Sequence, residues 1–127
     1  MKTHSRLTLS FLLLILIVPQ VGSSPPRKDG PHVEYYKNGK KACEEHYNYG
    51  KLVSASVWKP DGTPCPLTKI VDGSGILVFW HENGQKKAEV HYKNGLQDGL
   101  MILWHENGQK HWEAHYKDGI EISNKEF

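Results

Sequence analysis

Apolar and polar residues alternate along two segments of the chain, residues 85–92 and 109–116. Successive side chains of a β-strand point to opposite faces of a sheet, so this alternation predicts two strands that each have an apolar face and a mixed face. The predicted apolar face carries Ala88, Val90, Tyr92, Trp112, Ala114 and Tyr116. The predicted mixed face carries Lys87, Glu89, His91, His111, Glu113 and His115. The segments 76–80 and 100–104 are apolar on both sides, and we expect them to be the preceding strands.

Asn-Gly or Asp-Gly pairs separate these segments and predict how they are joined. They stand at 38–39, 61–62, 83–84, 94–95, 107–108 and 118–119. Both central residues of a tight hairpin turn need a positive φ, which Asn, Asp and Gly tolerate best. Strands of five to eight residues between such turns are typical of β-hairpins and not of helices.

The chain also repeats itself. The heptad WHENGQK occurs at 80–86 and again at 104–110, and a weaker copy of the surrounding pattern covers 36–50. A degenerate copy begins at Trp58. A tyrosine follows the turn glycine by eight positions in three copies, as Gly39 and Tyr47, Gly84 and Tyr92, Gly108 and Tyr116. Self-similarity at a spacing of 22 to 24 residues is the signature of a repeat protein.

These patterns predict an all-β fold in which tandem antiparallel β-hairpin repeats form an elongated, twisted meander sheet over residues 31–122. A single hairpin is only marginally stable, so burial must come from neighbouring hairpins. We expect the repeated aromatic residues to stack along the sheet, because each brings a large apolar area. The predicted structural repeat residues are Trp58, Trp80, Gly84, Tyr92, Trp104, Gly108 and Tyr116.

The N-terminus has the order of a secretory signal peptide. Lys2 and Arg6 precede the apolar run 7–18, and Pro19 and small residues at 21–23 follow it. A membrane-spanning helix needs about 20 apolar residues, so this run is short for one. We therefore predict a signal peptide at 1–23, a linker at 24–30, the repeat domain, and a polar tail at 123–127 that frays. The signal peptide predicts a secreted or periplasmic protein.

Charge and motifs exclude several classes of function. Without Lys2 and Arg6, 14 of the 16 basic residues remain against 14 acidic ones. Nucleic-acid binders show a clustered basic footprint, which is missing here. A membrane-surface module on the aromatic face is disfavoured as well, because anionic lipids attract clustered Lys or Arg. No nucleophile–base spacing indicates an enzyme, and no motif indicates a cofactor.

Histidines and cysteines are the remaining candidates for chemistry. His111, Glu113 and His115 form a string that could converge on zinc, but duplication of the repeat explains recurring histidines without a metal, so no metal is assigned. Cys43 and Cys65 would meet an oxidising environment after export. Equivalent positions of consecutive hairpins lie about 9.6 Å apart, whereas a disulfide needs Cα atoms within about 7 Å. The sequence therefore leaves open whether these cysteines pair.

The repeated pattern consists of an aromatic residue, two further residues, Asn-Gly and then Glu-x-x-Tyr-x-x-Gly. This pattern resembles the MORN repeat variant. The resemblance covers residues 30–122 but departs at 63–73, where TPCPLTKIVDG has two prolines and lacks Glu-x-x-Tyr, so the register of the second copy stays undetermined. Bacterial chains of this kind are commonly labelled toxin–antitoxin system antitoxins of the YwqK family. The resemblance implies tandem β-hairpins and a binding role, and it implies no catalytic residues.

We therefore expect an exported binding module whose partner is another protein. The candidate contact residues lie on the mixed face and are Glu89, His91, His111, Glu113 and His115. A merely solvated face remains the alternative for these residues, because repeats copy surface positions as readily as functional ones. An antitoxin-like protein that neutralises a toxin remains the alternative function.

The signal peptide makes a direct prediction. N-terminal sequencing of the protein recovered from an expressing cell should begin near Ser24, because the small residues at 21–23 are the cleavage signal. Recovery of a soluble cytoplasmic protein that begins at Met1 would rule out export.

Overall fold

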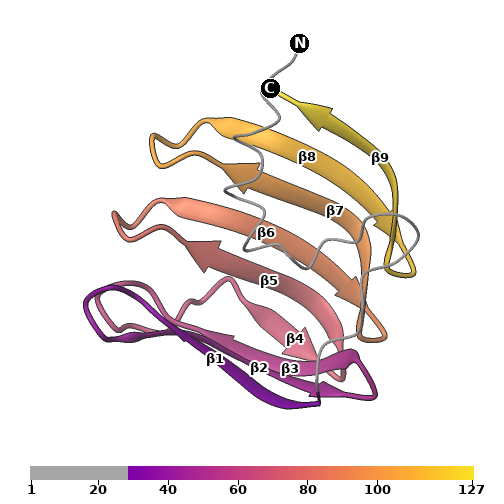
Figure 1. Ribbon diagram of the computed structural model, residues 1–127, viewed down its shortest axis with the longest axis horizontal. Coiled ribbons are helices and arrows are strands. Elements are labelled where there is room, and N and C mark those ends of the chain that lie inside the picture. Colours follow the sequence, from indigo (N-terminus) through magenta and orange to yellow (C-terminus); the bar gives the residue numbers. More distant parts are fainter. Residues whose placement is uncertain (1–28) are drawn as a thin grey trace.

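A computed structural model of the chain describes residues 29–127 and contains nine β-strands and no helix in this range. Within each of its two sheets, consecutive strands pair antiparallel in chain order, as the alternating pattern predicts (Figure 1). The strands are β1 (Gly30–Tyr35), β2 (Lys41–Asn48), β3 (Lys51–Val57), β4 (Lys69–Val71), β5 (Ser74–Trp80), β6 (Lys86–Lys93), β7 (Leu96–Trp104), β8 (Lys110–Lys117) and β9 (Ile120–Glu126). The all-β hairpin meander is confirmed.

The meander is divided into two sheets, whereas the sequence predicted one continuous sheet. Strands β1 to β3 form the first sheet and β4 to β9 form the second, with the break between β3 and β4 (Figure 1). The connection between these two strands is 58–68, and its second half belongs to the segment 63–73 that departs from the repeat pattern. Its single backbone bridge joins Trp58 to Pro64, and only Lys69–Val71 is extended enough to pair with β5.

Turns hold the two sheets together at the break. The Leu52 amide donates to the carbonyl of Gly95 at 3.0 Å, and the Gly95 amide donates to that of Gly73 at 2.9 Å. The Gly73 amide in turn donates to Val53 at 2.9 Å. A β-carbon on Gly95 would lie 2.5 Å from Lys51 Cβ and 2.9 Å from the Leu52 oxygen. Glycine is required here because two backbones approach each other closely.

The turns are of two kinds, and the sequence predicted only one. Asn94 and Gly95 both have a positive φ, as a tight two-residue hairpin turn requires, and the turns at 49–50, 72–73 and 118–119 match them. At the other end of the hairpins only the glycine has a positive φ, so the expectation of two positive φ values is wrong for 38–39, 61–62, 83–84 and 107–108. These turns are wider because the Asn or Asp side chain accepts the amide two residues later, as Asn83 does from Gln85 at 2.9 Å.

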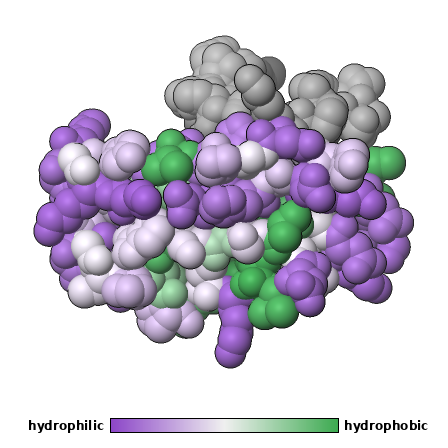
Figure 2. Space-filling view, turned by 90° about the horizontal axis from the view of Figure 1, so that it is seen from below, coloured by the Kyte–Doolittle hydropathy of each residue, from purple (hydrophilic) through white to green (hydrophobic). Residues whose placement is uncertain are grey.

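The predicted apolar face forms the core. Val90 is 4 % exposed and Ala114 is fully buried. One cluster joins the two sheets and contains Cys43, Tyr47, Leu52, Val57, Cys65, Leu77 and Val78. A second lies on β6 to β8 and contains Ala88, Val90, Met101, Leu103, Ala114 and Tyr116. Seen from the side of the first sheet, the surface is largely hydrophilic and its apolar areas are separate patches (Figure 2).

The end of the repeat domain lies later than the sequence suggested. Residues 123–126, predicted to fray, belong to β9, where Ser123 pairs with His115 and Glu126 pairs with Trp112. Backbone pairing with β8 outweighs their polar composition. Gly30, assigned to the linker, is the first residue of β1, while the predicted signal peptide and residues 24–28 lie outside the described residues.

Two glycine substitutions should distinguish the free-energy cost of backbone strain in a turn from the cost of a steric clash between the two sheets. Gly84→Ala places a β-carbon in open space at a φ of +87°, so it should cost about 1 kcal/mol of unfolding free energy. Gly95→Ala adds the clash with β3 and should cost about 3 kcal/mol. Urea unfolding measures both, and equal costs would contradict the close approach at Gly95.

Candidate functional site

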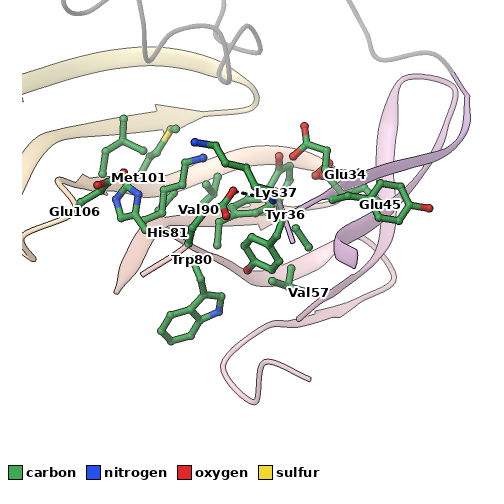
Figure 3. Close-up of a pocket in the computed structure, with 18 of the residues that line it drawn as sticks. Glu34, Tyr36, Lys37, Glu45, Val57, Trp80, His81, Val90, Met101 and Glu106 are labelled. Atoms are coloured by element: carbon green, nitrogen blue, oxygen red, sulfur yellow. Dashed lines mark hydrogen bonds between the residues drawn. The ribbon is translucent and has the colours of Figure 1, made fainter. Parts of the chain in front are cut away.

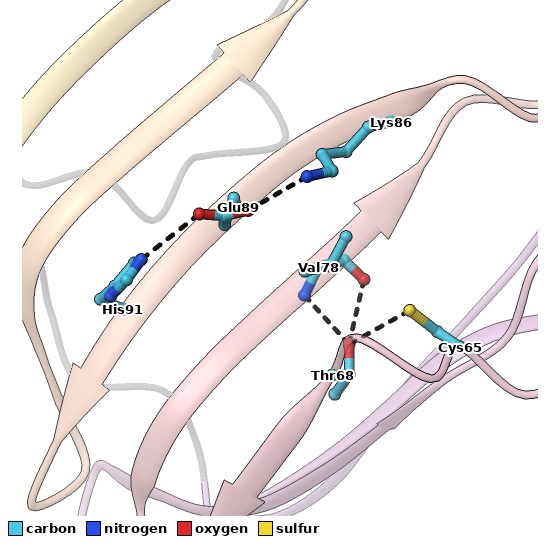
Figure 4. A network of polar contacts seen from close by, with 6 residues as sticks. All are labelled: Cys65, Thr68, Val78, Lys86, Glu89 and His91. Atoms are coloured by element: carbon cyan, nitrogen blue, oxygen red, sulfur yellow. Dashed lines mark hydrogen bonds and ion pairs between the residues drawn. The ribbon is translucent and has the colours of Figure 1, made fainter.

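A Lys–Glu–His set recurs on the mixed face of three strands, and we call these sets the triads. On β6, Lys86 Nζ lies 3.2 Å from Glu89 Oε2, and His91 Nε2 lies 3.4 Å from Glu89 Oε1 (Figure 4). The corresponding distances on β2 are 3.6 Å for Lys41 to Glu44 and 3.8 Å for His46 to Glu44. On β8, Lys110 Nζ lies 2.9 Å from Glu113 Oε2, and His115 follows two residues later.

A β-bulge at the start of each strand makes the triads. Trp80 pairs with Lys86 while Phe79 pairs with Ala88, so the extra residue Lys87 has no partner in the register. The bulge changes the side-chain parity and brings Lys86 beside Glu89 at a spacing of three residues. Lys87, which strict alternation placed on the mixed face, lines a cleft on the apolar side.

The same bulge corrects the predicted site at β8. Trp104 pairs with Lys110 and Leu103 pairs with Trp112, so Lys110 is the side chain that contacts Glu113. His111 instead packs with its ring centroid 4.4 Å from that of His105. Of the predicted contact residues, the structure therefore places Glu89, His91, Glu113 and His115 in the triads and His111 in a histidine pair.

Neighbouring side chains and burial shift the pKa values of the two triad glutamates and of His111. Burial alone would raise the pKa of Glu89, but hydrogen bonds from Lys86 and His91 outweigh it and hold that pKa below its ordinary value. The hydrogen bond from Lys110 lowers the pKa of Glu113. Burial, together with the charge of His105, lowers the pKa of His111. Both glutamates are therefore held in the ionised form by the lysine three residues earlier.

Lysines lie over the repeated aromatic rings. Lys86 Nζ lies 5.0 Å from the centre of the Trp104 ring, and Lys59 Nζ lies 4.7 Å from that of Trp80. Similar contacts join Lys41 to Trp58 and Lys110 to Phe127. The expected stacking of the aromatic rings on one another is wrong for the tryptophans. The backbones of alternate strands are about 9.6 Å apart, and Lys86 from β6, which lies between β5 and β7, covers the Trp104 ring.

The cysteines and the histidine string do not form the sites that the sequence left open. Cys43 and Cys65 are buried free thiols, and their nearest polar contacts are with glutamates for the first and with Thr68 for the second. Thr68 also braces β5, because its hydroxyl accepts the amide of Val78 at 3.0 Å (Figure 4). Residues 29–127 contain no group of three His, Cys, Asp or Glu arranged to hold a metal ion.

A cleft of about 340 Å³ lies on the opposite, apolar side, between the two sheets (Figure 3). Its floor includes Phe79, Val90 and Met101, and Glu82 on its rim accepts the Lys37 amide across the sheets at 3.0 Å. Its wall holds Glu45, a carboxylate that is only 5 % exposed. The alternation along β2 is the signal that could have revealed Glu45, because this residue occupies the position that Val90 and Ala114 have in the later repeats.

Comparison with known proteins agrees with the repeat geometry. The MORN repeat variant family matches residues 28–49, 74–94 and 97–118, just over half of the chain. The chain belongs to the MORN repeat variant family. No curated protein and no solved structure matches the chain.

The three matched segments of this MORN protein correspond to the three hairpins that carry the triads, and the unmatched stretch contains the break between the sheets. MORN repeats are binding modules that contact proteins or membranes, and the family is not a catalytic one. Within residues 29–127, no helix is long and apolar enough to cross a membrane.

The triads predict how stability depends on pH. The pKa of Glu89 is lower in the folded chain than its ordinary value of 4.5, so its contribution to stability is full above that value and is lost as the pH falls through the folded pKa. Glu89→Gln should therefore lose less unfolding free energy than the wild type between pH 7 and pH 3, as measured by urea unfolding at each pH. An equal loss in both proteins would show that the ion pairs with Lys86 and His91 add nothing.

Proposed function

We propose that this MORN protein is an exported protein-binding module, without catalysis, whose triad-bearing face contacts a partner protein in the cell envelope or outside the cell. The observation that carries the proposal is the recurrence of the Lys–Glu–His set on three hairpins. Each set presents a lysine, a carboxylate and an imidazole in the same order along its strand.

The arrangement suits recognition of another protein. The triads on β6 and β8 are two strands apart, about 9.6 Å, so a partner meets the same group of charges at a regular interval. The Glu89 and Glu113 side chains are each 23 % exposed and already paired, so they hold a defined geometry. Fixed charge patterns favour specificity for one partner over another. Half-exposed tryptophans beside the lysines offer apolar contact area at the same face.

A membrane surface is a weaker candidate for the occupant of this face. Anionic lipids attract clusters of uncompensated Lys or Arg, whereas Lys41, Lys86 and Lys110 each have a glutamate partner. The alternative function is neutralisation of a toxin, as in the antitoxin-labelled members of the family. A cytosolic antitoxin does not agree with an N-terminal export signal, so the exported module is preferred.

The test compares partner capture by two charge-reversal variants. Glu89→Lys/Glu113→Lys changes the triads, while Glu121→Lys/Glu126→Lys makes the same change in net charge on β9. Exposed substitutions usually shift stability by less than about 0.5 kcal/mol, although each glutamate here also loses a pairing, so thermal unfolding must first show that both variants are folded. Chemical crosslinking in the envelope fraction, followed by mass spectrometry, should then lose the partner only with the triad variant.

Recovery of the same partners by the triad variant would show that this face is not the contact surface. Rescue of cells from a toxin encoded beside the protein, with no export, would favour the antitoxin function instead.

A further inference from the structure

The cleft between the two sheets has a composition unlike the triad face. Its floor is apolar, and its walls come from β1, β2 and β3 on one side and from β5, β6 and β7 on the other (Figure 3). A volume of about 340 Å³ is in the range of sites for small ligands or single side chains, about 300–1,000 Å³. The break in the meander creates this space, because a continuous sheet would have no second wall.

Two carboxylates stand together on the first-sheet wall. Cys43 Sγ lies 3.8 Å from Glu34 Oε1 and 3.9 Å from Glu45 Oε2, so both acids flank the same thiol. Burial and the two nearby carboxylates raise the pKa of Cys43, which keeps the thiol neutral. The pair is therefore a local concentration of negative charge beside an apolar floor.

Glu45 is the exceptional member of the pair. It is buried where the later repeats have Val90 and Ala114, both apolar. Tyr47 donates its hydroxyl to Glu45 Oε1 at 2.7 Å, and His32, the cross-strand neighbour of Glu45, packs edge-on against the Tyr47 ring. No salt bridge among residues 29–127 includes Glu45. Burial of a carboxylate costs free energy unless a cation or several hydrogen bonds compensate for it, so this position favours binding of a cationic group.

Aromatic side chains add a second preference for a cation. The rings of Tyr36, Phe79 and Tyr92 line the cleft, and cations are attracted to the faces of such rings. The rim carries Glu82 and Glu106 against Lys37 and Lys87, so with the two wall carboxylates the lining is acidic. Charge and ring chemistry thus point to the same kind of ligand, one with an apolar stem and a cationic end.

We propose that this cleft binds an arginine side chain of the partner polypeptide, with the guanidinium against Glu34 and Glu45 and the aliphatic stem along Phe79 and Val90. A guanidinium suits the site because it is planar, donates several hydrogen bonds to carboxylates and stacks on aromatic rings. The proposal rests on the proposed function in that its ligand belongs to a protein partner, but the site is separate from the triads.

A pair of short capped peptides tests the proposal. One has an arginine between two leucines, and the other has citrulline in its place, which keeps the shape and removes the charge. Titration of the protein, followed by amide shifts in its NMR spectrum, should show the arginine peptide binding at least about tenfold more tightly, with shifts at the cleft residues.

Matched variants locate the effect. Glu45→Val inserts the residue of the β6 repeat and should bind both peptides equally, and Glu45→Gln, which keeps the shape of the side chain, should do the same if the valine variant fails to fold. Glu126→Gln changes an exposed carboxylate on β9 that belongs neither to a triad nor to the cleft lining, and this variant should discriminate like the wild type. Equal binding of both peptides by the wild type, absence of binding, or retained discrimination in Glu45→Val would overturn the proposal. Because the peptides do not report on the triads, failure here leaves the crosslinking result standing, and the reverse also holds.

Discussion

Each strand of a meander can satisfy its backbone groups only through the strands before and after it, and the rest of this structure depends on where that pairing continues and where it stops. From β4 to β9 it continues without interruption, and the result is a regular sheet with one buried face. It stops once, between β3 and β4, where Pro64 and Pro66 of the connection 58–68 cannot donate to a ladder. The turns at Gly73 and Gly95 then hold the two sheets together, and the space between them becomes the cleft.

The triads arise from the turns as well. The wide turns at 38–39, 83–84 and 107–108 each contain an Asn that accepts a backbone amide, and a bulge lies beside each of them. The bulge moves the lysine onto the face of the glutamate three residues later, and the lysine also covers an aromatic ring of the next strand. The turn and the bulge beside it therefore join neighbouring hairpins and also arrange the charges of the mixed face. This coupling explains why the heptad recurs unchanged, since the turn, the ring and the lysine depend on one another.

The two faces have different relations to the repeat. Duplication of the repeat accounts for the triad face, because every matched hairpin has the same Lys, Glu and His. Duplication does not account for the cleft, because Glu45 stands where the later repeats have an apolar residue and because the opposite wall comes from another sheet. A repeated surface suits an extended contact with a partner. A single buried carboxylate in an otherwise apolar wall, such as Glu45, suits the binding of one side chain of that partner. The two proposed contacts therefore involve different parts of a partner.

By itself the sequence determined the strand class, the hairpin order and the burial of Val90, Ala114 and Tyr116, because alternation and turn residues act over a few neighbouring positions. It also identified Glu89 and Glu113 as regular members of the mixed face. Only the tertiary structure decided which lysine joins them, since a bulge changes parity without any change in composition. The division into two sheets, the pairing of 123–126 and the role of Glu45 were decided there too, because each depends on contacts between segments far apart in the chain.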